Sequence, residues 1–76
     1  LSVGDRASAL AAQGMTQHLL ENAQATDIST EMGRAALRLN EKIKDLRDSE
    51  NRKMEAGTTL TAVFIRNGEL FSVSCR

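Results

Sequence analysis

The dipeptide Asn67-Gly68 constrains the fold of this chain more than any other feature, because it stands between two short apolar runs. Both central residues of a type I′ turn need positive φ, and Asn followed by Gly is the sequence most typical of that turn. A two-residue turn also fixes how the flanking strands pair. The sequence therefore predicts a β-hairpin over residues 58–75.

The register of this hairpin follows directly from the turn. One face is expected to carry the pairs Leu60–Cys75, Ala62–Val73, Phe64–Phe71 and Arg66–Glu69, and the other the pairs Thr61–Ser74, Val63–Ser72 and Ile65–Leu70. The first face is apolar up to an ion pair at the turn end, so it is expected to pack on the rest of the chain. The second is apolar near the turn and rich in hydroxyls away from it. A two-stranded sheet also has two unpaired edges, so a further partner is expected.

A first amphipathic helix is predicted over residues 5–23. Ser2 and Asp5 have the spacing of a capping box. Apolar residues recur at steps of three and four and form one stripe, which comprises Ala7, Leu10, Ala11, Met15, Leu19 and Leu20. Gly14 interrupts the helix at a cost of about 1 kcal/mol relative to Ala, which indicates that another element passes close to it.

A second helix is predicted over residues 28–50, with Asp27 or Ser29 as its cap. Its apolar stripe comprises Ile28, Met32, Ala35, Ala36, Leu39, Ile43 and Leu46. Between Glu41 and Glu55 lie ten charged residues, five of each sign, which we interpret as a solvated helix face that leads into a linker. The short polar connection between the helices favours an antiparallel pair. The predicted fold is α+β, a helix pair packed on the C-terminal hairpin.

The composition limits both size and partners. A chain of 76 residues buries only about 60% of its unfolded surface, and its single cysteine allows neither an intrachain disulfide nor a structural zinc site. We therefore expect residues 1–76 to form one incomplete domain, completed by homo-oligomerisation or by strand or segment swapping. Ten basic residues against ten acidic ones argue against nucleic acid as a partner. No apolar run approaches the roughly 20 residues that span a bilayer, and the lone thiol favours the cytoplasm.

Two side chains are candidates for reactive chemistry, His18 and Cys75. No serine, cysteine or carboxylate stands at a motif spacing from His18, so we interpret it as a residue beside the core stripe. Arg76 could make the adjacent thiol of Cys75 more reactive, but a half-buried strand thiol is the preferred interpretation. The glycines match no phosphate-binding loop. No catalytic, cofactor-binding or metal-binding residue is therefore assigned.

Three stretches, in order, resemble the metal-dependent serine/threonine phosphatases of the 2C type, especially the bacterial members. Residues 4–13 are similar to the G-E/D-x-A-S-x-x-A opening of that family's first helix, and residues 39–43 to the x-A-N-x-x-I of its second. Residues 57–71 are similar to its G-T-T-x-x-A strand and hairpin. The resemblance implies a β-sandwich flanked by helix pairs, with two Mg²⁺ or Mn²⁺ ions held by aspartates at one end.

The metal-binding motifs of that family have no counterpart in this sequence. Its A-D-G-x-G-G precedes the first helix, where this chain opens with Leu1-Ser2-Val3-Gly4. Its G-D-S-R follows the hairpin, where this chain closes with Ser74-Cys75-Arg76. No residue is therefore matched to a family metal ligand, and no cofactor is assigned to this chain.

The resemblance leads us to expect a structural segment of a 2C-type phosphatase domain, cut between two metal-binding motifs. As an isolated chain it is expected to be inactive and to associate with itself, and a phosphoprotein substrate is expected only for an intact parent. The alternative is an independent protein–protein interaction module. An enzyme that uses His18 or Cys75 ranks last.

Overall fold

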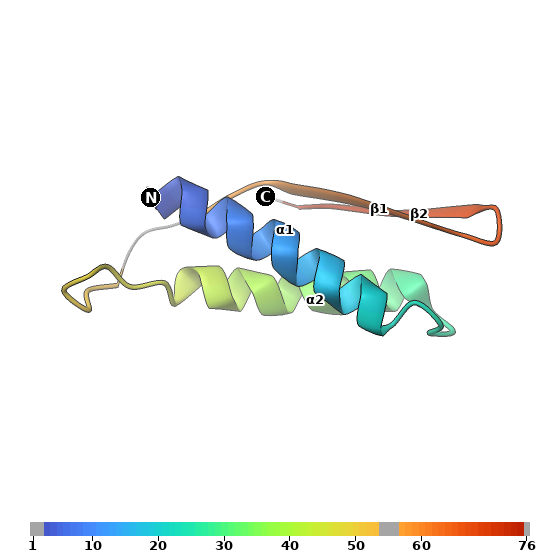
Figure 1. Cartoon of the computed structure of the whole chain (residues 1–76), viewed down its shortest axis with the longest axis horizontal. Coiled ribbons are helices and arrows are strands. Elements are labelled where there is room, and N and C mark those ends of the chain that lie inside the picture. Colours follow the sequence, from blue (N-terminus) through green and yellow to red (C-terminus); the bar gives the residue numbers. More distant parts are fainter. Residues whose placement is uncertain (1–2, 54–56, 76) are drawn as a thin grey trace.

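A computed structural model describes residues 3–53 and 57–75 as two helices followed by a two-stranded antiparallel hairpin. The elements are α1 (Val3–Glu21), α2 (Ile28–Lys44), β1 (Leu60–Arg66) and β2 (Glu69–Cys75). The molecule measures 46 × 16 × 15 Å. The helices run in opposite directions and lie on the same side of the hairpin (Figure 1). The predicted α+β class and the packing of a helix pair on the hairpin are thus confirmed.

Helix α1 buries four residues of the stripe that its sequence predicts, whereas Leu10 is partly buried and Leu20 is exposed. Its buried residues are Ala7, Ala11, Met15 and Leu19. Leu20 was expected in the stripe but is 72% exposed, because adjacent residues of an α-helix point about 100° apart and Leu19 takes the inward position. Ser2, the expected capping residue, lies outside the described residues.

The glycine in α1 lies against the second helix. A Cβ built at Gly14 would overlap Cδ2 of Leu39 and would lie only 3.4 Å from its Cγ. The close approach inferred from the sequence is therefore present, and the absence of a side chain at this position lets the two helices pack closely.

Helix α2 begins where the sequence predicts. Asp27 is its N-cap, and its carboxylate accepts hydrogen bonds from the Thr30 backbone N–H (3.2 Å) and the Thr30 hydroxyl (2.6 Å). These bonds satisfy a backbone donor that the helix itself leaves unpaired. The buried residues of α2 are Ile28, Met32, Ala35, Leu39 and Ile43.

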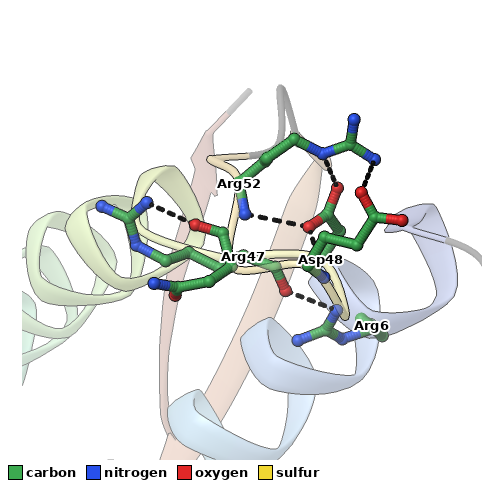
Figure 2. A network of polar contacts seen from close by, with 6 residues as sticks. Arg6, Arg47, Asp48 and Arg52 are labelled. Carbon is green, nitrogen blue, oxygen red and sulfur yellow. Dashed lines mark hydrogen bonds and ion pairs between the residues drawn. The ribbon is translucent and has the colours of Figure 1, made fainter.

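The prediction that this helix continues to about residue 50 is wrong, because it ends at Lys44. The loop that follows folds around Asp48, whose Oδ1 accepts hydrogen bonds from the backbone N–H groups of Glu50 and Arg52, both at 2.9 Å (Figure 2). A short acidic side chain that binds the backbone ahead of it competes with helical hydrogen bonds. Asn51 has a φ of 63°, which also lies outside the helical range. The charged stretch therefore folds into a loop instead of a helical turn.

Arginine side chains form ion pairs within this loop and a hydrogen bond between the loop and α1 (Figure 2). Arg52 pairs with the carboxylates of Asp48 (3.0 Å) and Glu50 (3.1 Å). Arg6 of α1 donates a hydrogen bond to the backbone carbonyl of Arg47 at 3.0 Å. The end of α2 is thus held near the start of α1.

The hairpin has the register that its turn predicts. All seven pairs from Leu60–Cys75 to Arg66–Glu69 are formed, and Asn67 and Gly68 have φ values of 52° and 80°. The face that carries Phe64 and Phe71 packs on the helices. The residues of this inner face in the main core cluster are Leu60, Ala62, Phe64, Phe71 and Val73.

Candidate interaction surface

The hairpin turns one face away from the helices, and we call it the outer face. Its residues are Thr61, Val63, Ile65, Leu70, Ser72 and Ser74. Val63, Ile65 and Leu70 form the half nearest the turn and are 57%, 68% and 64% exposed. The remaining half carries hydroxyls, and the Oγ1 of Thr61 lies 3.4 Å from the Oγ of Ser74. The outer face is therefore a surface with an apolar end and a hydroxyl end.

The edges of the hairpin also carry unpaired backbone groups. Among the described residues the sheet contains only β1 and β2. Arg66 and Glu69 flank a two-residue turn and so form a hydrogen-bonded pair, and hydrogen-bonded and non-hydrogen-bonded pairs alternate along the ladder. It follows that the backbone N–H and C=O groups of the outer-face residues point outward along both edges. Val63, Ile65 and Leu70 thus present both exposed apolar side chains and unpaired backbone groups.

Arg66 fixes the turn end of the hairpin on the helices. Its Nη1 donates to the carbonyls of Ala23 (3.0 Å) and Ala25 (2.6 Å) in the loop between α1 and α2. Its guanidinium also lies 5.9 Å from the centre of the Phe71 ring. The ion pair between Arg66 and Glu69 that the sequence predicted is not formed in the described part of the chain, because Arg66 donates to these carbonyls instead. The contact with these carbonyls could not be predicted from the sequence, because their position depends on how the loop between the helices folds.

His18 forms a contact between the two helices that the sequence did not predict. Its Nε2 lies 3.0 Å from the Oε2 of Glu31, and both side chains are largely buried. The expectation that His18 lies beside the core is confirmed. Glu31 is distant in sequence, so only the packing of α1 on α2 could identify it as the partner.

A polar groove of about 180 Å³ lies beside His18, between α1 and α2. It is lined by Gly14, Gln17, His18, Glu21, Ala35, Arg38, Leu39 and Lys42. None of these lining residues is a serine, threonine or cysteine, so the groove offers His18 no hydroxyl or thiol side chain to activate. Cys75, the other reactive candidate, belongs to β2, and its side chain lies outside the described part of the structure. The backbone of Cys75 pairs with Leu60 at the end of the hairpin away from the turn.

A second hollow of about 220 Å³ lies between α2 and the start of β1. Its lining is mostly apolar and comprises Ala11, Ala36, Leu37, Leu39, Asn40, Ile43, Thr58 and Leu60. It is smaller than the roughly 300–1,000 Å³ of typical small-molecule sites. Among the exposed large apolar residues of the described part of the chain, Val63, Ile65 and Leu70 share the outer face of the hairpin, whereas Leu20 and Leu37 lie on α1 and α2.

The divalent metal centre implied by the family resemblance does not fit the residues present. Across residues 3–53 and 57–75, no group of three or more His, Cys, Asp or Glu side chains is placed to hold a metal ion. Mg²⁺ and Mn²⁺ require several oxygen ligands that converge on one point. No chemical step through a metal is therefore derived for this chain.

Comparisons with protein-family models, with curated proteins and with solved structures found no match to this chain. Within the described residues, neither helix has the length and apolar character needed to cross a membrane.

Proposed function

We propose that this chain is a structural segment of a 2C-type serine/threonine phosphatase domain. The observation that carries the proposal is the meeting of the three stretches that resemble that family. Ala7 and Ala11, from the first stretch, form a buried cluster with Ile43, and Leu60 from the G-T-T-like strand packs against it. Residues that are far apart in sequence but belong to one motif set are thus neighbours in space.

The architecture supports a buttressing role for this segment. The helices cover only the inner face of the hairpin, and the apolar half of the outer face is left exposed. In a larger domain, further β-structure would cover this face. In the isolated chain, self-association is the route by which it becomes buried.

Catalysis is proposed to belong to an intact parent protein in the cytoplasm, with a phosphoprotein as its substrate. Phosphate-ester hydrolysis in a two-metal enzyme needs carboxylates that hold the ions and generate the attacking hydroxide. The described residues offer no such group. We therefore predict that the isolated chain does not hydrolyse phosphate esters.

The coding sequence on either side of this segment tests the proposed identity. An in-frame A-D-G-x-G-G upstream and an in-frame G-D-S-R directly downstream are expected. A start codon and a stop codon at the two ends would contradict the proposal and favour an independent module.

A hydrolysis assay tests the predicted inactivity. The purified chain is incubated with p-nitrophenyl phosphate and Mn²⁺, and release of p-nitrophenol is followed by absorbance. We expect no release above a protein-free control. Hydrolysis that co-elutes with the chain through two chromatographic steps and is lost on chelation would show that the chain is itself a metal-dependent enzyme.

The alternative function is that of an independent protein-interaction module. The exposed Val63, Ile65 and Leu70 favour this possibility as well, because an apolar patch of this kind is typical of a protein contact. A start codon and a stop codon at the two ends, combined with a stable folded monomer, would support it against the phosphatase segment.

A further inference from the structure

We propose that Asn67 is a site of spontaneous deamidation, and that the folded type I′ turn protects it until the turn end of the hairpin opens. The modification replaces the side-chain amide of Asn67 with a carboxylate, and its co-reactant is water. The inference rests on the hairpin alone and does not depend on the proposed phosphatase segment.

Asn67 is the one asparagine of the chain that a glycine follows. The other three, Asn22, Asn40 and Asn51, precede residues that carry a side chain. Glycine has no Cβ, so its backbone nitrogen is the least crowded of any residue. Asn67 and Gly68 are both exposed, and beyond the chain neighbours no heavy atom lies within 4 Å of the position that a Cβ of Gly68 would take. The reacting groups are therefore open to water and to base.

The reaction needs only the atoms of this dipeptide, a base and water. Base removes the proton of the Gly68 backbone N–H, and the nitrogen attacks Cγ of Asn67. A C–N bond forms, the bond from Cγ to the side-chain amide nitrogen breaks, and ammonia leaves after taking up a proton. Water then opens the cyclic imide. Breakage of the bond between the Gly68 nitrogen and Cγ gives aspartate, and breakage of its bond to the main-chain carbonyl carbon gives isoaspartate.

The closed turn holds the reacting atoms apart. The φ values of Asn67 and Gly68, 52° and 80°, are those of a type I′ turn, in which ψ of the first central residue is about +30°. At this ψ the Gly68 nitrogen lies nearly opposite Cβ of Asn67 across the Cα–C bond. The cyclic imide requires that nitrogen on the same side as Cβ, so the Cα–C bond must rotate before the attack. The closed turn is therefore unreactive.

Contacts beside the turn keep it closed. Arg66 and Glu69 form the last pair of the ladder. Nη1 of Arg66 donates to the carbonyls of Ala23 and Ala25, at 3.0 and 2.6 Å. Its guanidinium lies 5.9 Å from the centre of the Phe71 ring. Since these contacts form only when the turn end lies on the loop between the helices, the rate of deamidation reports how often the turn end opens.

The two products differ in whether the turn closes again. Aspartate followed by glycine suits a type I′ turn, as asparagine does. Isoaspartate routes the main chain through Cβ, which adds one main-chain atom between the strands. The pairing of Arg66 with Glu69 fits a two-residue turn, so the isoaspartate form is expected to lose this pair. Formation of isoaspartate thus converts a transient opening of the hairpin into a lasting one.

Incubation of the full chain in ¹⁸O-labelled water at mildly alkaline pH tests the site and its protection. Mass spectrometry of proteolytic peptides measures deamidation at each asparagine, and chromatography separates the aspartate and isoaspartate forms. In urea that unfolds the chain, Asn67 is expected to react fastest, to gain one labelled oxygen and to give isoaspartate among its products. In buffer the reaction at Asn67 is expected to be at least about tenfold slower, because the turn must open first.

Two variants test the role of Arg66, each through its rate in buffer divided by its own rate in urea. Arg66→Thr removes the contacts of the guanidinium, and threonine suits a strand. Its ratio is expected to be about tenfold higher than that of the unmodified chain, because hydrogen bonds from a charged donor stabilise the closed turn. Arg38→Gln is the matched control, because it removes the same charge from an exposed position of α2, and its ratio should not change.

Equal rates at Asn67 in buffer and in urea would overturn the proposal, as would faster reaction at Asn22, Asn40 or Asn51 in urea. Equal ratios for Arg66→Thr and Arg38→Gln would overturn the role of Arg66. Helical circular dichroism checks that each variant is folded. If Arg66→Thr is not folded, the comparison of the unmodified chain in buffer and in urea decides.

The separated products test the consequence for the hairpin. The aspartate form is expected to unfold at the same urea concentration as Asn67→Asp and close to that of the unmodified chain. The isoaspartate form is expected to unfold at a lower urea concentration. Equal midpoints for the two forms would contradict the loss of the turn.

Discussion

At the level of single residues, two helical glycines differ only in their surroundings. Gly14 lies against Leu39, and a Cβ there would overlap that side chain. Gly33 of α2 has no heavy atom within 4 Å of the position that its Cβ would take. Alanine substitutions at these two positions therefore distinguish the effect of helix propensity on stability from the effect of helix packing.

Gly33→Ala is expected to raise the free energy of unfolding by about 0.5–1 kcal/mol, because alanine is the better helix former. Gly14→Ala gains the same propensity but overpacks the helix interface, which costs about 1–3 kcal/mol, so its net effect should be a loss of about 1 kcal/mol. Urea unfolding followed by circular dichroism measures both. Equal stabilisation by the two substitutions would show that the helices do not pack closely at Gly14.

Asp27 makes the stability of α2 dependent on pH. The hydrogen bonds from the Thr30 hydroxyl, and then from the Thr30 backbone N–H, lower the pKa of Asp27 below its ordinary value of 3.8. A carboxyl group whose pKa is lowered on folding stabilises the fold above its unfolded pKa, and this contribution is lost as the pH falls through the folded value. The cap is therefore expected to weaken below about pH 4.

Asp27→Ser keeps a capping oxygen but removes the titration. The melting temperature of the variant should be close to that of the unmodified chain at pH 7 and should fall less on acidification. Thermal unfolding followed at 222 nm, at pH 7 and at about pH 2.5, measures the difference. An equal fall in both proteins would contradict the role of the Asp27 carboxylate.

At the level of elements, the hairpin depends on a turn that few residues can adopt. Gly68 has a φ of 80°, whereas Gly57 has no positive φ and no heavy atom near the position of a Cβ. Gly68→Ala is expected to cost about 1 kcal/mol or more, because a left-handed conformation strains an L-residue. Gly57→Ala is the control and should change stability little. Urea unfolding measures the free energy of unfolding of both variants. An equal change in the two variants would show that a side chain at position 68 does not strain the turn.

The elements that could be predicted from the sequence are those set by local rules. The Asn67-Gly68 turn determines the whole hairpin register, and the spacing of Met32, Leu39 and the other apolar residues identifies the buried side of α2. The end of α2 could not be predicted in this way, because the charged residues after Lys44 remain compatible with a helix until the Asp48 side chain binds backbone N–H groups.

The long-range contacts could likewise not be predicted from the sequence pattern. The pairing of His18 with Glu31 requires the crossing of two helices. The binding of Arg66 to carbonyls of the loop between the helices requires the folded loop. The apolar half of the outer face was predicted from the register alone, because alternation along a strand is a local rule.

At the level of the whole molecule, residues 3–53 and 57–75 form two layers, and among these residues only one face of the sheet is covered. The helices cover the inner face, and Val63, Ile65 and Leu70 remain exposed on the outer face. Burial of that face by a second copy is the proposed self-association of the isolated chain. It accounts for an apolar surface that neither the helices nor the hairpin can cover.

The most direct test is an isotope-filtered nuclear Overhauser experiment on a mixture of ¹³C-labelled and unlabelled chains, at a concentration high enough for the proposed self-association. Intermolecular cross-peaks are predicted between the methyl groups of Ile65 and Leu70 in one copy and the same residues in the other. Cross-peaks that arise instead from Leu20 or Leu37, or no intermolecular cross-peaks at all, would contradict the account.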